Sequence, residues 1–202
     1  FFGPNTSTSN RCMIGGMVGN NSSGTTSIQY GVTRDKIREL HAILSDGSDA
    51  VFSEISKEEF HLKTRQLTLE GQIYKAIHEE LSSESVQTDI LKEFPKPEIH
   101  RRNTGYAIDK LIESDVFTNS DKRFNMCQLL TGSEGTLAFT TEITLQLDKL
   151  PPLDSALVCL HFESIESCLK SVETVMQHDL HTCEMMDKTI LDLTKHNKTQ
   201  QE

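Results

Sequence analysis

The sequence predicts an α+β fold, in which helices cover a mainly antiparallel sheet and the start of an α/β unit follows. The Asp46-Gly47 turn signal separates an apolar stretch over 28–44 from Ala50-Val51-Phe52, which predicts a β-hairpin. Residues 139–147 alternate between apolar and polar side chains, as a half-buried strand does. Residues 56–82 instead repeat apolar side chains at helical intervals.

Composition limits the classes of protein to consider. The chain has 202 residues, 25% of them charged, and a net charge of −10. This length suits one large domain or two small ones, and the negative charge argues against binding to nucleic acid or to an anionic membrane. No apolar run is long enough to span a membrane, and no signal peptide is visible.

The cysteines and the chain ends add two expectations. The five cysteines are scattered, odd in number and without a CxxC pair, which favours reduced thiols in a cytoplasmic protein. The chain opens on Phe1 rather than Met and stops without a closing element, so we expect a piece of a longer protein.

The predicted sheet and its covering helices follow from local signals. Periodicity over 28–44 fits a helix nearly as well as a strand, and the turn after it favours the strand. Ser56 precedes Glu59 at the spacing of a capping box. We expect one or two helices over 56–82 with a break at Gly71, and another over 86–94 that ends at the prolines following it. Their expected role is to cover one face of the sheet.

Leu150-Pro151-Pro152-Leu153 is the clearest boundary signal in the chain. Beyond it we expect a buried strand over 156–162, a core-facing helix over 165–176 and a second strand over 182–187. Another helix is expected to follow from Lys188. A strand–helix–strand–helix order predicts an α/β unit.

Two glycine motifs are the candidate functional elements. Residues 14–24 contain four glycines followed or interrupted by small polar residues, so their backbone N–H groups could cradle phosphates or a flat ring. Residues 132–136 read Gly-Ser-Glu-Gly-Thr before the predicted strand, which suits either a tight turn or a diphosphate. Composition alone favours a surface loop for the first motif.

A third segment lies between these motifs. Arg101 and Arg102 are either solvated charges or the ligands of an anion, and a short helix is expected to open near Thr104.

Familiar catalytic patterns are missing from the sequence. It contains no HExxH, GxSxG, Walker A or GxGxxG motif. His178 and His181 have a spacing that is weak evidence for a metal without a third ligand, so no metal site is expected. No set of side chains identifies a catalytic base.

Taken in order, the motifs resemble the FAD-linked oxidases of the vanillyl-alcohol oxidase (PCMH-type) superfamily. The branch they resemble most contains the D-lactate, glycolate and D-2-hydroxyglutarate dehydrogenases. The matching segments are Ile14-Gly15-Gly16, Asn20-Asn21-Ser22-Ser23-Gly24, Tyr30-Gly31, Asp46-Gly47, Asn103-Thr104-Gly105-Tyr106, Gly132-Ser133-Glu134-Gly135-Thr136-Leu137, Thr140 to Leu145 and Glu184-Met185-Met186-Asp187. The family usually has Asn-Ala-Gly-Gly where this chain has Asn21-Ser22-Ser23-Gly24.

The resemblance implies two domains. Residues 1–149 would be the second subdomain of a PCMH-type FAD-binding domain, with a helical insertion at about 53–94. Residues 150–202 would begin the C-terminal cap domain of the FAD-linked oxidases. The insertion and residues 100–106 resemble the large proteins that fuse this module to an iron–sulfur domain, so an iron–sulfur cluster is an expectation only for a region beyond residue 202.

The resemblance also implies which residues would line FAD. The first motif would lie along the pyrophosphate and isoalloxazine, and the second motif with the strand after it along the pyrophosphate, ribose and adenine. The cofactor-binding residues predicted in this way are Ile14, Gly15, Gly16, Asn20, Asn21, Gly24, Gly132, Ser133, Glu134, Gly135, Thr136 and Ile143. The family's substrate and metal ligands lie further into the cap, so none is assigned here.

The implied activity is hydride transfer from the α-carbon of a 2-hydroxy acid to flavin, with D-lactate, glycolate or D-2-hydroxyglutarate as the substrate. The partners would be that acid and an electron acceptor, in the cytoplasm or, for the parent protein, at the periphery of the inner membrane. The alternatives are a non-catalytic nucleotide- or ligand-binding module of the same fold, and a scaffold that has lost its cofactor. We expect the chain alone to be inactive and to bind FAD weakly, because half of the cofactor's contacts would be absent.

Overall fold

The computed structural model describes residues 1–99, 101–102 and 105–195. The chain divides into two compact units, Phe1–Asp148 and Lys149–Glu202, and each is described by itself. Their identity as FAD-binding and cap domains stays a prediction.

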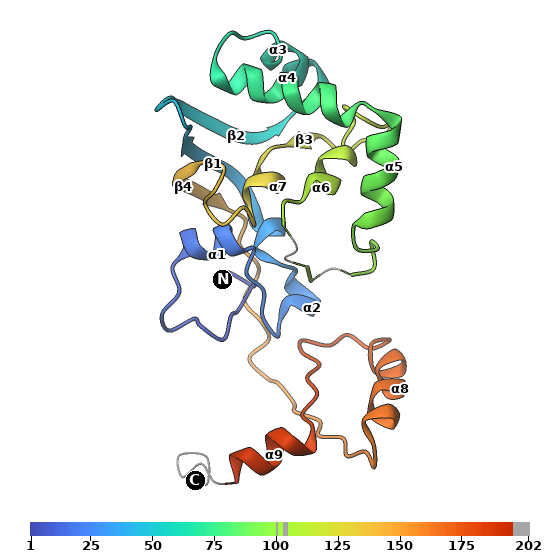
Figure 1. Ribbon diagram of the computed structural model, residues 1–202. Coiled ribbons are helices and arrows are strands. Elements are labelled where there is room, and N and C mark those ends of the chain that lie inside the picture. Colours follow the sequence, from blue (N-terminus) through green and yellow to red (C-terminus); the bar gives the residue numbers. More distant parts are fainter. Residues whose placement is uncertain (100, 103–104, 196–202) are drawn as a thin grey trace. The chain divides into compact units, whose positions relative to one another are not determined.

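A four-stranded antiparallel sheet forms the centre of the first unit (Figure 1). The strands lie in the order β3 (Phe124–Asn125), β2 (Asp49–Ile55), β1 (Ile37–Ile43) and β4 (Phe139–Leu145). The predicted hairpin is confirmed as β1 and β2, and the predicted alternating strand as β4. Leu40 faces Phe52 on one side and Ile143 on the other, so the buried side chains of the three strands meet on one face.

Three helices of the predicted insertion pack beside the sheet (Figure 1). They are α3 (Lys57–Lys63), α4 (Leu69–Leu81) and α5 (Glu84–Glu93). The capping box is confirmed: the Ser56 hydroxyl accepts a hydrogen bond from the Glu59 N–H at 3.2 Å, and the Glu59 carboxylate accepts from the Ser56 N–H at 2.8 Å. Helix α5 ends just before the Phe94-Pro95 bond, as the sequence predicts.

The predicted break at Gly71 is wrong. The helices separate at residues 64–68, and Gly71 lies in the first turn of α4. Its N–H donates to the capping hydroxyl of Thr68, and a Cβ there would lie 2.4 Å from the Gln66 carbonyl oxygen. Glycine is therefore needed for a close approach at the start of a helix, a use that local sequence does not distinguish from a break.

An aromatic cluster links the insertion to the sheet. The Phe60 ring on α3 lies 4.6 Å from the Phe124 ring on β3 and 5.3 Å from the Tyr74 ring on α4, measured between centroids. All three side chains are buried, and Leu40 and Phe52 of the hairpin belong to the same core. Burial of these large apolar surfaces stabilises the unit.

Short helical segments connect the rest of the first unit. The first glycine motif forms α1 (Ile14–Asn20), followed by α2 (Ser27–Tyr30) and the 3₁₀ helix η1 (Thr33–Lys36). Helices α6 (Ile108–Ile112) and α7 (Cys127–Leu130) precede and follow β3. The predicted helix start near Thr104 lies outside the described residues, and α6 begins at Ile108.

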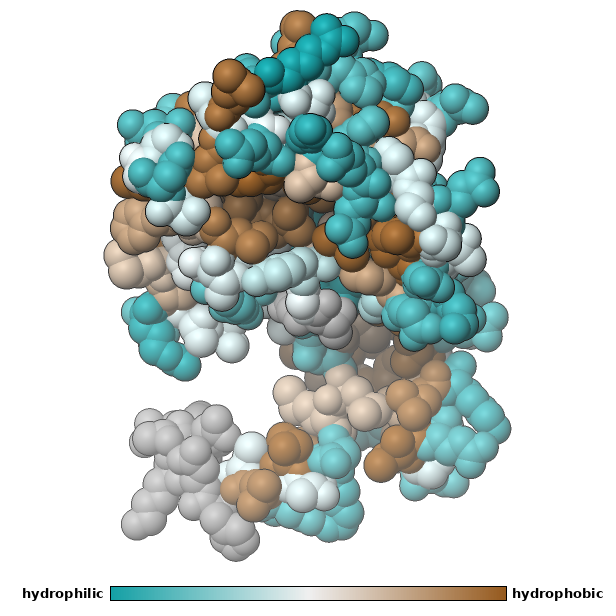
Figure 2. Space-filling view, turned by 45° about the horizontal axis from the view of Figure 1, so that its top comes forward, coloured by the Kyte–Doolittle hydropathy of each residue, from teal (hydrophilic) through white to brown (hydrophobic). Residues whose placement is uncertain are grey.

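The second unit contains the two predicted helices, α8 (Ile165–Val175) and α9 (Lys188–Thr194). The predicted strands over 156–162 and 182–187 are wrong for this structure, since both segments are irregular. A strand needs a neighbouring strand to pair its backbone groups, and the described residues of this unit provide none. The apolar stripe of α8 is therefore exposed rather than buried in a core (Figure 2).

Candidate functional site

The fold brings the two predicted glycine motifs into contact. The N–H of Gly132 donates to the Val18 carbonyl at 2.9 Å, and the N–H of Glu134 donates to the Gly19 carbonyl, also at 2.9 Å. A Cβ at Gly19 would lie 3.7 Å from the Cα of Glu134. The carboxyl end of α1 therefore lies directly against the 132–136 segment, although more than a hundred residues separate the two in the sequence.

The second motif forms a tight turn. Gly132, Glu134 and Gly135 have positive φ values of 89°, 53° and 70°, a region in which glycine has no steric penalty. The Ser133 carbonyl accepts from both the N–H and the hydroxyl of Thr136, at 3.0 and 2.6 Å. The N–H groups of Gly132, Ser133, Glu134 and Thr136 thus all donate to backbone carbonyls within the protein.

Glycines of both motifs expose their backbone. A Cβ added at Gly15, Gly16 or Gly135 would meet nothing within 4 Å. The neighbouring Ile14 and Asn20 side chains are exposed as well. A ligand can therefore approach the main chain of α1 and of the 132–136 turn without displacing any side chain, which is the property that a glycine cradle requires.

Several of the predicted cofactor residues, among them Gly24, Ile143 and Asn21, are involved in packing within the protein. A Cβ at Gly24 would lie 1.5 Å from the Asn5 carbonyl oxygen, so this glycine permits two backbone segments to touch. Ile143, on β4, is the pairing partner of Leu40 on β1 and packs against the core. Asn21 is buried, with φ of 49° at the end of α1. None of the three contributes to the open backbone described above.

Asn21 connects α1 to Arg34, which lies in η1. Its side-chain oxygen accepts from the Arg34 backbone N–H at 2.9 Å. The Arg34 guanidinium is buried and donates to the carbonyls of Gln128 and Thr131, at 2.9 and 2.5 Å. A Cβ at Gly132 would lie 2.7 Å from the guanidinium Nη2, so the absence of a side chain there leaves room for Arg34.

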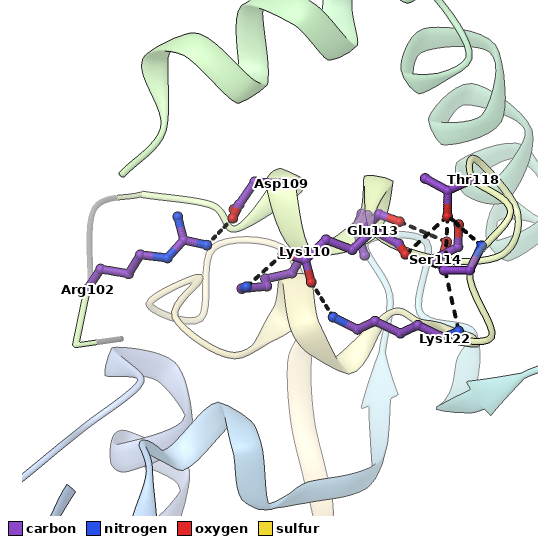
Figure 3. A network of polar contacts seen from close by, with 9 residues as sticks. Arg102, Asp109, Lys110, Glu113, Ser114, Thr118 and Lys122 are labelled. Carbon is purple, nitrogen blue, oxygen red and sulfur yellow. Dashed lines mark hydrogen bonds and ion pairs between the residues drawn. The ribbon is translucent and has the colours of Figure 1, made fainter. Parts of the chain in front are cut away.

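A second arginine lies near this cluster. Arg102 forms an ion pair with Asp109 at the start of α6 (Figure 3), and its guanidinium lies 6.0 Å from the centre of the Phe94 ring. Arg34, Arg102 and Asp109 line one small cavity together. Burial, and after it the positive charge of Arg102, lower the pKa of Arg34, but a guanidinium stays protonated in proteins.

Sequence reasoning missed Arg34 and Tyr106 as site residues. Arg34 follows the first motif in a short segment without periodicity, so nothing local indicates that its charge is buried. Tyr106 lies within a recognised motif, and its hydroxyl is 2.7 Å from that of Thr136 in the turn. Arg101 also reaches the first motif, where its Nε donates to the Ser23 hydroxyl at 3.3 Å.

Comparisons with known proteins support the resemblance. Residues 1–51 match the family model described as the FAD binding domain. The chain is 31% identical over 195 residues to the D-2-hydroxyglutarate dehydrogenase of Escherichia coli K12, and 30% identical over 197 residues to that of Haemophilus influenzae. The enzyme of the same name from Pseudomonas putida is 31% identical over 195 residues.

Each of these matches covers 96% of this chain and 18% of the relative. The family model thus matches about a quarter of this chain, and the chain aligns with about a fifth of the length of these dehydrogenases. No solved structure matches it significantly. Within the described residues, no helix has both the length and the apolar character needed to cross a bilayer.

Proposed function

We propose that this chain forms part of the FAD site of a dehydrogenase that oxidises a D-2-hydroxy acid. The observation that carries the proposal is the open backbone of Gly15 and Gly16 beside the turn that contains Gly135. The relatives named D-2-hydroxyglutarate dehydrogenases make D-2-hydroxyglutarate the first substrate to test.

The residues on the open surface fit a dinucleotide with a flat ring and a diphosphate. Gly15, Gly16 and Gly135 would hold the cofactor through close backbone contact, because no side chain separates it from the main chain. The Gly135 N–H has no protein acceptor within the described part of the chain, so it is free to donate to the cofactor. Bound FAD would supply the acceptor for a hydride, and this chain's part is to bind and orient it.

Substrate, acceptor and compartment follow from the same proposal. The small-molecule partner is a 2-hydroxy acid, and a separate electron acceptor must reoxidise the flavin. The compartment in this proposal is the cytoplasm, which the scattered and odd-numbered cysteines of the sequence favour.

An absorbance spectrum of the intact protein between about 350 and 500 nm, where bound flavin absorbs, tests the proposal. We expect flavin bands that bleach when D-2-hydroxyglutarate is added without an acceptor. Bands that persist with D-2-hydroxyglutarate, D-lactate and glycolate would refute the dehydrogenase. A protein without bands in the presence of excess FAD would refute the cofactor and favour another ligand for the glycine motifs.

The Gly15→Ala variant tests the location of the cofactor. Gly15 lies in the first turn of α1, so alanine there should stabilise the protein without FAD by less than the roughly 1 kcal/mol that glycine costs in a helix interior. The same methyl group should weaken FAD binding at least tenfold. Lys75→Ala, on the exposed side of α4, is the control and should leave FAD affinity unchanged. An unchanged affinity in Gly15→Ala would place FAD elsewhere.

A further inference from the structure

Arg34 is a buried cation without a carboxylate in contact. Only 5% of the surface of this residue is exposed, and its guanidinium donates to two backbone carbonyls. Among the described residues, no ion pair includes it. Burying a charge in this way costs free energy unless another group compensates it, so the position calls for an explanation.

The neighbouring charges leave the cluster positive. Arg102 and Asp109 pair with each other and cancel. Asp35 is exposed, and its carboxylate accepts from the Val32 N–H, so solvent screens its charge. The unit charge of Arg34 therefore remains, held beneath the two glycine motifs.

The contacts of Arg34 reach both motifs at once. Its backbone N–H donates to the side-chain oxygen of Asn21 at the end of α1, and its Nη2 donates to the Thr131 carbonyl just before the turn. The guanidinium also lies against the side of Gly132 where a Cβ would be. A shift of this one residue would therefore change the spacing between α1 and the 132–136 turn.

We propose that Arg34 is a positioning residue for the cofactor: it fixes the two glycine motifs relative to each other and places a positive charge behind the bound diphosphate. The inference rests on the proposed function, in which the diphosphate is the part of FAD that both motifs share. It is also the part that carries negative charge, so its binding would compensate the buried cation. Arg34 contacts no reacting atom in this scheme.

The test compares Arg34→Met, Arg34→Lys and Arg38→Met in the intact protein. Arg38 is exposed on β1 and serves as the matched control. Titration of each protein without cofactor would give the dissociation constants for FAD and for riboflavin, which lacks the diphosphate. Thermal unfolding of the same samples reports whether each variant folds.

We expect Arg34→Met to weaken FAD binding at least tenfold and riboflavin binding less than threefold. Arg34→Lys keeps the positive charge but cannot reproduce the hydrogen bonds of the guanidinium to two carbonyls. Its FAD affinity should therefore lie between those of Arg34→Met and the wild type. Arg38→Met should bind both like the wild type. If Arg34→Met does not fold, the ratio of FAD to riboflavin affinity in Arg34→Lys decides.

Two results would overturn the inference. One is a folded Arg34 variant that binds FAD as the wild type does. The other is an equal loss of FAD and riboflavin affinity, which would indicate a structural role alone. A wild-type protein that binds no FAD would instead refute the proposed function, so the two failures are distinguishable.

Discussion

Gly24 and Gly15 belong to the same motif, and the structure uses glycine at the two positions for different reasons. A Cβ at Gly24 would collide with the Asn5 carbonyl, whereas one at Gly15 would point into open space. Packing within the protein therefore accounts for Gly24. It does not account for Gly15, whose open surroundings agree with the proposal that a ligand approaches the backbone there. Residues of one type in one motif thus separate into structural and functional positions only when their surroundings are known.

Cys127 gives a residue-scale prediction about pH. Its thiol is buried and donates to the Phe52 carbonyl at 3.0 Å, and burial raises its pKa to about 12. An unfolded cysteine loses its proton near pH 8.5. Above that pH the unfolded state binds fewer protons than the folded state, so the free energy of unfolding falls as pH rises from about 9 to 12.

Urea unfolding at pH 8 and pH 10 measures this effect. Between the two pH values, the free energy of unfolding of the wild type should fall by about 1–2 kcal/mol more than that of Cys127→Ala. The buried Tyr74 hydroxyl, whose pKa burial also raises, contributes equally to both proteins and cancels. Cys159→Ala removes an exposed thiol and should behave as the wild type. An equal pH dependence in Cys127→Ala would show that this thiol ionises normally.

At the scale of elements, some parts of the structure depend on local signals and others on long-range packing. The hairpin, the capping box before α3 and the end of α5 depend on neighbouring residues, and the sequence predicts all three. The segments over 156–162 and 182–187 have the composition of buried strands, but residues 149–195 of their unit provide no partner strand. A strand forms only when it pairs with another strand, which can be distant in the sequence, and a local pattern does not show whether that partner exists.

The capping box makes α3 a test of one element's contribution. Ser56→Ala removes the acceptor of the Glu59 N–H, and replacing such a cap costs about 0.5–2 kcal/mol. Because α3 holds Phe60 against β3, the loss should appear in the global unfolding transition. Ser85→Ala, in the first turn of α5, is the control and should change stability by less. Equal effects of both variants on urea unfolding would mean that α3 frays independently of the core.

Across the whole molecule, the candidate site combines parts that the sequence order keeps far apart. Each glycine motif is recognisable by itself, and the resemblance predicts that both line one cofactor. The contact between Gly19 and Glu134 and the burial of Arg34 depend on how the chain folds around the sheet. The local pattern contains no information about either. The sequence therefore identifies the glycines of the candidate site, but it does not identify the contacts that hold them in place.

The boundary between the two units yields a prediction for the whole chain. Asp148 is anchored, since its carboxylate pairs with Lys36 at 2.7 Å and its carbonyl accepts from the Phe1 amino group, also at 2.7 Å. Residues 149–153 are exposed, and the whole core cluster lies between Val18 and Leu145. Proteases cut exposed segments that open at little cost in free energy.

Brief digestion with thermolysin, followed by mass spectrometry, tests this difference. We expect a resistant product that begins at Phe1 and ends between residues 148 and 164, because the apolar residues of 149–164 are exposed and unpaired. The chain in urea should instead be cut throughout. First cleavage within the insertion, between α3 and α5, would contradict the prediction. It would mean that the aromatic contacts of Phe60 with Tyr74 and Phe124 do not hold the insertion to the sheet.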